Sequence, residues 1–454
     1  MTRIWADTSV YYSGWCEEYF MGVYIIRPKT TSVARSFKLA SRKFTRESRP
    51  SQVAEVVNFW QQDPGYKEIN SYLDSSYLDP FCGSGGLIRE IISSSKDADK
   101  LIRYQNRTSI TGTQVIDIPD EDIEQIRQDL PNALILRDLP IELIQPERNI
   151  IGKKGTVDVD DLWHLEAISL ITARQQGFTG TGKGITVAVL DSGIDANHPE
   201  ITGKIIESYR LNPRTQEIQT VPFEDTVGHG THVAGLICGN QVGVAPEAQI
   251  INSIMFPNGV CNLSDWISWF DWLALQPEIN IVNISAGELS LPAGYFELFN
   301  SLIDDLIAVG LLPICAVGNE GFNRSRTPGN CKGSLSVGAI NNKNKVASFS
   351  GNTTITNDYQ SYNVPYVVAP GESVYSSVLG GGYEAWNGTS MATPIVSGVA
   401  ALILEKYNKN ISVLNLLDEI LMNCQDLGLD KERQGKGLVQ VPKALYEPQR
   451  TPHS

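Results

Sequence analysis

Residues 387–394, with the sequence NGTSMATP, place a serine where it could act as a nucleophile. Ser390 lies between the small residues Gly388 and Ala392, and the apolar run 395–404 behind it predicts a buried helix. A hydroxyl at the beginning of a helix lies beside unpaired backbone N–H groups and the positive end of the helix dipole. This setting suits a nucleophile whose attack creates an oxyanion, and an ordinary serine N-cap is the alternative. A catalytic role therefore requires two partners elsewhere in the chain.

An aspartate and a histidine upstream have the chemistry that such a serine needs. The apolar run 185–190 ends in Asp191, so a rigid strand would hold a carboxylate ready to accept a hydrogen bond from an imidazole. His229 opens the small-residue stretch 229–235, HGTHVAG, which predicts a helix. A metal site formed with His232 is the alternative, but the i, i+4 spacing and the intervening glutamate of the zinc signature are absent. We therefore expect His232 to be a packed, hydrogen-bonded helix residue.

The elements that must position these residues alternate between strand and helix. Continuous apolar runs predict strands that are buried on both faces of a parallel sheet, and helix-like stretches lie between several of them. The pattern predicts the α/β fold class, a doubly wound and mostly parallel sheet that carries its chemistry at the carboxyl ends of its strands. The predicted strands are 185–190, 250–256, 279–284, 311–317, 335–340 and 366–369, and the predicted helices are 230–238, 265–275 and 295–309.

Three motifs in this order resemble those of the subtilisin-like (S8) serine peptidases. They are residues 187–195 (VAVLDSGID), 229–235 (HGTHVAG) and 388–394 (GTSMATP), and the resemblance extends over residues 161–445. Such a resemblance implies a subtilisin-like fold and a serine endopeptidase that hydrolyses protein or peptide substrates and requires no cofactor.

The resemblance also implies a mechanism through an acyl-enzyme intermediate. His229 would take the proton of Ser390 as its hydroxyl attacks the peptide carbonyl, and Asp191 would fix the imidazole tautomer. An alternative from a different class is a catalytically silent subtilisin-like protein that binds peptides or acts as a scaffold. A broken triad would favour that alternative, but every expected catalytic residue is present.

Further site residues follow from the same resemblance. Asn319, in the turn GNEG, is expected to donate to the oxyanion together with the backbone N–H of Ser390. Many members have glycine where this chain has Glu288, and we hypothesise that this charge favours Lys or Arg at P1, the substrate residue before the scissile bond; an outward-pointing surface glutamate is equally consistent. The residues expected to bind substrate and to wall the P1 site are Ser285, Ala286, Gly287, Glu288 and Gly318.

The stretch after the predicted histidine helix bears on metal binding. Calcium-stabilised members carry a longer loop there, whereas residues 236–246 run through without that insertion. The strong calcium site of the family is therefore not expected, no metal ligand is assigned, and weaker structural calcium sites stay open.

The 454 residues exceed the usual size of one domain, so several units are expected. Residues 155–447 are predicted to form the catalytic domain, residues 106–150 a small α+β segment, and residues 1–105 an N-terminal extension of unknown role. Within the small segment, strands are expected at 113–118, 132–138 and 140–144, with a helix at 121–130. This segment resembles part of the family's inhibitory propeptide, so we expect it to be a partner of the catalytic domain and to be cut autocatalytically within residues 144–160.

One stretch of the extension suggests a different function. Residues 78–86, LDPFCGSGG, resemble the S-adenosylmethionine loop of nucleic-acid methyltransferases. A working domain would need several βα units after the loop, but only one helix-like segment, 87–94, follows, and no Asn-Pro-Pro-Tyr-type motif is present. A Gly/Ser turn that leads into a helix explains these residues more simply. In the same extension, residues 22–26 are a candidate strand.

Composition and charge exclude several partners and suggest a compartment. The net charge of −14 argues against a nucleic-acid binder. No apolar run reaches the roughly 18 residues of a membrane helix, since residues 298–317 are interrupted by Asp304 and Asp305. Seven cysteines without a CxxC pair, and no recognisable secretory signal, predict free thiols and a cytoplasmic location.

Overall fold

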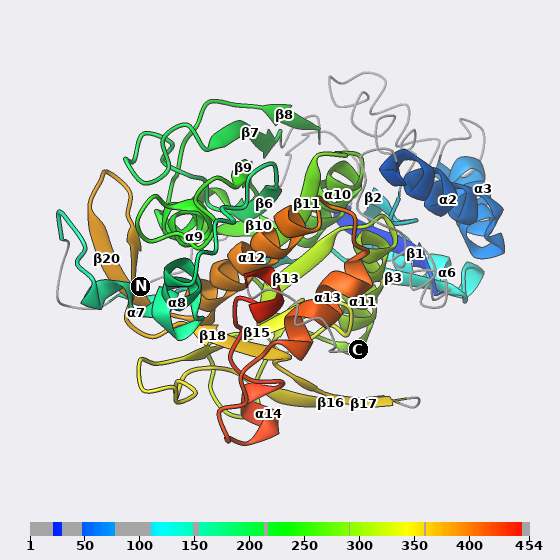
Figure 1. Cartoon of the computed structure of the whole chain (residues 1–454). Coiled ribbons are helices and arrows are strands. Elements are labelled where there is room, and N and C mark those ends of the chain that lie inside the picture. Colours follow the sequence, from blue (N-terminus) through cyan, green and yellow to red (C-terminus); the bar gives the residue numbers. More distant parts are fainter. Residues whose placement is uncertain are drawn as a thin grey trace, which may run out of the picture. The chain divides into compact units, whose positions relative to one another are not determined.

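The computed structural model describes residues 21–29, 48–77, 110–148, 154–212, 217–289, 291–357 and 360–446 (Figure 1). These residues belong to two compact units. The smaller unit contains residues 21–29, 60–77 and 110–139, and the larger unit contains residues 48–59 together with the described residues from 140 onward. No helix among the described residues is long and apolar enough to cross a membrane.

The smaller unit is built on a three-stranded antiparallel sheet in the order β2-β1-β3. Isoleucines at alternate positions of these strands, such as Ile26 and Ile116, pack with Ile69 into one apolar cluster. The bounds of its elements are β1 (Met21–Pro28), α3 (Pro64–Tyr77), β2 (Gln114–Pro119), α6 (Ile123–Asp129) and β3 (Ala133–Arg137).

The strands expected at 113–118 and 132–138 and the helix expected at 121–130 are present in this unit as β2, β3 and α6, as is the candidate strand at 22–26, whereas the strand expected at 140–144 belongs to the larger unit. That strand is β1, and it lies between β2 and β3. It therefore shares a sheet with strands of the predicted propeptide-like segment, residues 106–150, although the sequence assigned it to the N-terminal extension. The methyltransferase-like loop at 78–86 and the helix-like segment 87–94 lie outside the described residues.

The larger unit contains an eight-stranded sheet in the order β18-β15-β13-β11-β6-β9-β7-β8. All neighbouring strands are parallel except the edge pair β7 and β8. The six strands predicted from apolar runs are the contiguous ones from β18 to β9, whereas β7 and β8, which follow β9 at one end of the sheet, lack such runs and were not predicted. The bounds are β6 (Thr186–Asp191), β7 (Ile205–Leu211), β8 (Ile218–Thr220), β9 (Gln249–Ile254), β11 (Ile279–Ile284), β13 (Leu312–Ala316), β15 (Leu335–Ile340) and β18 (Val367–Pro370).

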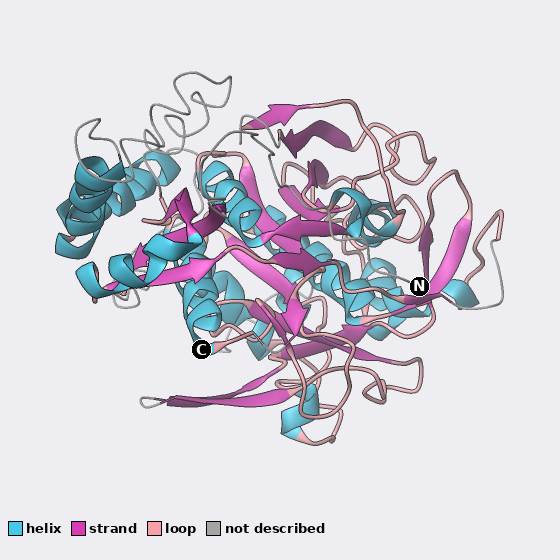
Figure 2. Ribbon diagram, turned by 180° about the vertical axis from the view of Figure 1, so that it is seen from behind, coloured by secondary structure: helices cyan, strands magenta, loops and turns pink. Residues whose placement is uncertain are grey.

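Helices cover both faces of this sheet, which confirms the predicted doubly wound α/β fold (Figure 2). Helix α12 is buried from its first residue to Leu404 and packs against α9 and five strands of the sheet. Helices α10 and α11 pack together on the other face. They share a face because crossovers between parallel strands are right-handed, and the chain crosses the sheet in the same direction through α10 and through α11. The bounds are α7 (Trp163–Ala167), α8 (Leu170–Gln175), α9 (His229–Cys238), α10 (Leu263–Ala274), α11 (Ala293–Ala308), α12 (Thr389–Lys406), α13 (Val413–Met422) and α14 (Lys431–Gln434).

Four small sheets complete the larger unit. Two of them contain short strands from the segment that enters it, residues 140–148, paired with strands much later in the chain. The pairs are β4 (Pro140–Glu142) with β10 (Val260–Asn262), β12 (Glu288–Leu289) with β14 (Arg326–Thr327), β16 (Thr353–Asn357) with β17 (Gln360–Val364), and β5 (Glu147–Arg148) with β20 (Tyr383–Asn387), which also pairs with β19 (Val374–Ser377).

The beginning of helix α2 (Ser48–Gln62) is fixed to the larger unit by one buried arginine. Arg49 is 4% exposed and donates to the carbonyls of Gln276 (3.4 Å), Ile279 (2.9 Å) and Gly310 (3.2 Å). Two of these carbonyls follow the carboxyl ends of α10 and α11, where the helix dipoles favour a cation. Burial lowers the pKa of Arg49 to about 10, so it stays charged at neutral pH.

We predict that Arg49→Met lowers the free energy of unfolding by about 2–4 kcal/mol, because three buried carbonyls lose a charged donor. Urea unfolding measures this, with Ser390→Ala present in every protein to prevent self-digestion. Arg137→Met is the matched control, since that side chain is 61% exposed and its surface ion pair contributes at most about 1 kcal/mol. Equal stability of the two variants would contradict the prediction.

Candidate active site

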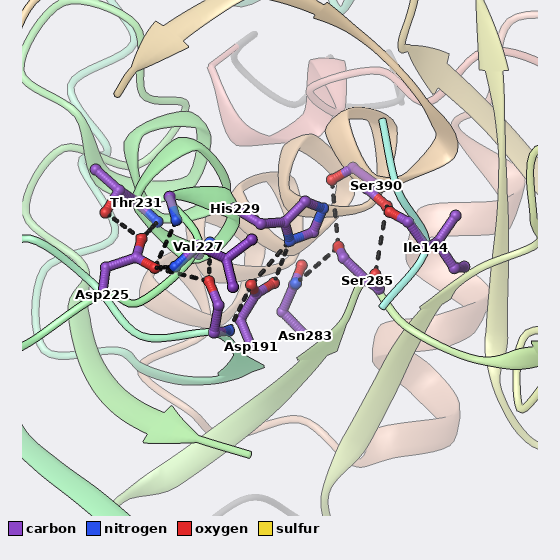
Figure 3. Close-up of polar contacts among 12 residues, drawn as sticks. Ile144, Asp191, Asp225, Val227, His229, Thr231, Asn283, Ser285 and Ser390 are labelled. Carbon is purple, nitrogen blue, oxygen red and sulfur yellow. Dashed lines mark hydrogen bonds and ion pairs between the residues drawn. The ribbon is translucent and has the colours of Figure 1, made fainter. Parts of the chain in front are cut away.

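A buried carboxylate and an imidazole form the centre of the site. Asp191 ends β6, and His229 begins α9. The imidazole Nδ1 lies 2.8 Å from both carboxylate oxygens of Asp191, and both residues are almost fully buried (Figure 3). The next residue must be glycine, because a Cβ on Gly230 would lie 2.1 Å from the carbonyl oxygen of Gly193. The chain therefore brings the helix start directly against the strand end.

A second carboxylate fixes the loop that carries the histidine. Asp225 accepts hydrogen bonds at one oxygen from the N–H groups of Val227 (3.0 Å) and Gly228 (2.7 Å), and at the other from Thr231. A negative charge at this position also stabilises the positive end of α9. Sequence reasoning missed Asp225, although an acidic residue just before a helix start is a recognisable capping signal.

Ser390 lies in the first turn of α12, and its hydroxyl is turned towards two carbonyls. Its Oγ lies 3.3 Å from the carbonyl oxygens of Ile144 and of Ser285, so its single proton is shared between alternative bonds. The Nε2 atom of His229 is buried and has no hydrogen-bond partner among the described residues. The structure thus joins His229 to Asp191, while the serine hydroxyl is engaged by Ile144 and Ser285.

A proline within α12 explains how the backbone at Ser390 is held. Pro394 has no N–H, so the carbonyl of Ser390 four residues earlier has no helical donor. The hydroxyl of Ser285 supplies one at 3.2 Å, and Asn283 donates to that hydroxyl in turn (Figure 3). A side chain predicted to bind substrate therefore also holds the backbone of the serine.

Asn319 lies beside the same helix start and is oriented by it. Its side-chain oxygen accepts hydrogen bonds from the N–H and the hydroxyl of Thr389, each at 2.9 Å. This fixes the amide so that its NH₂ group points the other way, where Nδ2 donates to the carbonyl of Gln145 at 3.4 Å. The hydroxyl of Thr389 also accepts from the N–H of Gly318. The predicted oxyanion donor is thus preorganised, and its NH₂ group faces a carbonyl oxygen.

The chain's own residues 140–145 lie across these groups as an extended strand. Residues 140–142 pair with β10, and the N–H of Leu143 donates to the carbonyl of Gly259 at 3.0 Å. On its other side Leu143 forms an antiparallel bridge with Ala286. The segment is therefore an added strand between two segments of the larger unit, as in β-augmentation by a bound peptide. Ile144, which is 1% exposed, brings its carbonyl to Ser390.

The residues after Ala286 surround an arginine that sequence reasoning did not identify. Arg326 donates from Nη1 to the carbonyl of Gly287 (2.8 Å) and from Nε to Glu320 (2.7 Å). The carboxylate of Glu288 accepts from the N–H of Leu289. Burial raises the pKa of Glu288, against the opposing effects of that N–H and of Arg326.

His232, the second histidine of the motif, is packed as expected. Its ring stacks on Trp386 at 4.2 Å between centroids, and its Nε2 lies 3.1 Å from the carbonyl of Glu384. Another buried histidine, His164, lies 2.8 Å from the carbonyl of Val242. In the part of the chain that the structure describes, no group of three or more His, Cys, Asp or Glu side chains could hold a metal ion.

Comparisons with known proteins agree with this geometry. The model of the subtilase family matches residues 182–437, more than half of the chain. An intracellular serine protease of Paenibacillus polymyxa is 34% identical over 272 residues, which cover 57% of this chain and 79% of that protein. Subtilisin E of Bacillus subtilis (strain 168) is 34% identical over 279 residues, 59% of this chain and 67% of its own length. Alkaline elastase YaB of Bacillus sp. (strain YaB) is 30% identical over 388 residues, 84% of this chain and 90% of the relative.

The two packed histidines predict acid sensitivity. Burial lowers the pKa of His164 to about 4 and that of His232 to about 3. In the unfolded chain a histidine has a pKa of about 6.5. Below that pH the unfolded chain binds protons that the two buried imidazoles do not bind. The free energy of unfolding is therefore at its full value above about pH 6.5 and decreases as the pH falls towards the pKa values of the folded protein. Each histidine should lower the free energy of unfolding by about 2 kcal/mol between about pH 7 and pH 5.

Urea unfolding of the Ser390→Ala protein at these two pH values measures the loss. His164→Gln retains an N–H donor for Val242 but cannot be protonated, so its loss of stability between the two pH values should be smaller by about 2 kcal/mol. An equal loss in both proteins would contradict the assignment of this acid sensitivity to His164.

Proposed function

This chain belongs to the subtilase family and is a serine-type endopeptidase, and we propose that Asp191, His229 and Ser390 are its catalytic triad. The observation that carries the proposal is the 2.8 Å contact between His229 and Asp191. It leaves Nε2 of the same imidazole without a partner among the described residues, as a base that awaits the serine proton requires.

The proposed mechanism begins with a rotation of the serine hydroxyl. The hydroxyl of Ser390 leaves the carbonyl of Ile144 and turns to His229, which accepts its proton as Oγ attacks a peptide carbonyl. The new negative charge receives hydrogen bonds from the amide of Asn319 and from the backbone N–H of Ser390. The imidazolium, stabilised by Asp191, then protonates the leaving amine, and water hydrolyses the acyl-enzyme by the reverse path.

Residues 140–148 are proposed to be the inhibitory part of the propeptide-like segment. They run through the site with substrate-like pairing on both sides, and the carbonyl oxygen of Ile144 is the one that Ser390 contacts. The amide of Asn319, however, contacts the carbonyl of Gln145 and not that of Ile144. Because the oxyanion donor does not engage the carbonyl next to the nucleophile, we propose that the bound strand inhibits the enzyme and is cut slowly within residues 144–160.

The natural substrates are proposed to be proteins or peptides in a reducing, cytoplasmic compartment. Cys238, Cys315, Cys331 and Cys424 are free thiols, and all but Cys424 are buried. Burial also raises the pKa of Cys238 and of Cys424 to about 12, which keeps these thiols protonated. The name of the Paenibacillus relative, an intracellular serine protease, supports the same location. No cofactor is proposed to be required, and a weak structural calcium site stays a prediction.

A fluorophosphonate probe tests the triad and separates it from the scaffold alternative. We predict that the probe labels Ser390, that Ser390→Ala and His229→Ala abolish labelling, and that Asp191→Asn slows it by roughly 10⁴-fold. Ser361→Ala, which removes an exposed serine of β17, is the control and should label like the unmodified chain. Labelling of the Ser390→Ala protein at the normal rate would contradict the assignment.

The inhibitory strand is tested by weakening it. Ile141 and Leu143 are buried in the strand, whereas Glu142 between them is exposed. Placing carboxylates at both buried positions (I141D with L143D) should raise initial peptide hydrolysis at least about tenfold, since burying one charge costs more than 1.4 kcal/mol. E142Q should leave the rate unchanged. An unchanged rate in the double variant would show that the strand does not inhibit.

Intact-mass analysis tests cleavage in the same preparations. The unmodified chain should convert over time to a species cut within residues 144–160, and Ser390→Ala should keep its full length. An identical full-length mass for both proteins after prolonged incubation would contradict autoprocessing.

A further inference from the structure

The register of the bound strand indicates which of its residues would stand at P1. Leu143 is bridged to Ala286, and the carbonyl of the next residue, Ile144, is the one that Ser390 contacts. If the proposed function holds, Ile144 stands at P1 of a substrate-like strand. Its side chain is 1% exposed, so the enzyme encloses a branched aliphatic group at this position.

Arg326 spans the two walls expected for this site. On one side its guanidinium donates to the carbonyl of Gly287 at 2.8 Å. On the other, a Cβ added to Gly318 would lie 3.0 Å from Cγ of Arg326 and 2.6 Å from a carboxylate oxygen of Glu320. The aliphatic part of the Arg326 side chain, its stem, therefore lies over Gly318, the residue directly before Asn319, and its guanidinium reaches Gly287. Both wall residues are glycines, so the arginine side chain occupies space that they leave.

The arginine is held rigidly and its charge is balanced. Nε and Nη2 of Arg326 contact the same oxygen of Glu320 at 2.7 and 2.6 Å, and Nη1 donates to the carbonyl of Gly287. The side chains of Arg326 and Glu320 are only 20% and 15% exposed. Removing one partner of such a largely buried pair leaves an uncompensated charge, so the pair resists displacement by an incoming side chain.

We propose that the Arg326–Glu320 pair closes the P1 site to long and aromatic side chains, so that the enzyme prefers medium-sized aliphatic residues at P1. A long basic side chain would have to displace a guanidinium from its carboxylate, and an aromatic ring would have to enter the space of the Arg326 stem. Arg326 is thus a specificity-determining residue, and this proposal rests on the proposed function.

The proposal and the Glu288 hypothesis make opposite predictions for basic substrates. Glu288 would favour Lys or Arg at P1, whereas the Arg326–Glu320 pair disfavours both. The carboxylate of Glu288 is already bound to the N–H of Leu289 at 3.1 Å. The same substrate series therefore decides between the two ideas.

The test uses the full chain with the weakened strand (I141D with L143D) and peptides that differ only at P1, with Leu, Ile, Phe, Lys or Glu. For the parent protein we expect kcat/KM for Leu to exceed that for Phe and for Lys at least about tenfold, a ratio typical of a steric difference in a substrate site. Arg326→Ala should raise the Phe-to-Leu ratio at least about tenfold. Arg326→Met, which keeps the stem but not the charge, should raise it much less.

Arg324→Ala is the matched control, because it removes an exposed arginine two residues away with the same change in charge. A Phe-to-Leu ratio in Arg326→Ala within twofold of the parent would overturn the proposal, as would a parent preference for Lys that Glu288→Gln abolishes.

Binding of the same peptides to the corresponding Ser390→Ala proteins, followed by fluorescence anisotropy, gives a second readout that needs no turnover. Fluorophosphonate labelling distinguishes the two levels of the account. Absent labelling of Ser390 refutes the catalytic assignment, whereas normal labelling with an unchanged P1 preference in Arg326→Ala refutes only the role of Arg326.

Discussion

The contact between the imidazole of His229 and the carboxylate of Asp191 is the interaction on which the site depends. A carboxylate with no exposed surface is stable only if partners compensate for the water it has lost. Asp191 has two, the imidazole and the N–H of Ser192 at 2.7 Å. Both arise from the fold, because the end of β6 lies against the beginning of α9 and Gly230 allows the two backbones to approach. The sheet thus fixes one imidazole nitrogen and leaves the other available.

The position of the serine depends on a different part of the chain. Helix α12 lies in the core, and its proline leaves one carbonyl for Ser285 to bind, so the segment predicted to bind substrate and the serine are coupled. Thr389 orients Asn319 in the same turn. The proposed nucleophile and the proposed oxyanion donor are therefore fixed by one helix start. A strand laid beside that start, as residues 140–145 are, meets all of them at once.

Much of this arrangement follows from local sequence. Runs such as 185–190 are apolar throughout because both faces of the strand are covered, so central strands and their order along the chain were predictable. The candidate site residues were proposed because each stands at the end of a strand or at the start of a helix in a recognisable motif. Strands β7 and β8, at one end of the sheet, were missed because polar residues such as Glu207 are exposed there and interrupt the apolar signal.

Contacts between distant residues were not predictable from one sequence. Residues 140–144 have the pattern of a strand, but nothing in that pattern shows that its partners are β10 and Ala286. Arg49 and Arg326 look like ordinary charged residues in the sequence, since only the fold shows that the first contacts three carbonyls and the second a largely buried carboxylate. The charge of Glu288 was visible in the sequence, whereas its hydrogen bond to the following N–H was not.

The most direct measurement is proton NMR of the imidazole hydrogen that the account places on Nδ1 of His229. In the full chain, this proton should give a resonance well downfield of the amide region that is coupled to a histidine nitrogen, because it is donated to a buried carboxylate. The signal should persist in Ser390→Ala and disappear in Asp191→Asn. A signal that survives the loss of Asp191, or no such signal in the unmodified protein, would contradict the pairing on which the proposed catalysis rests.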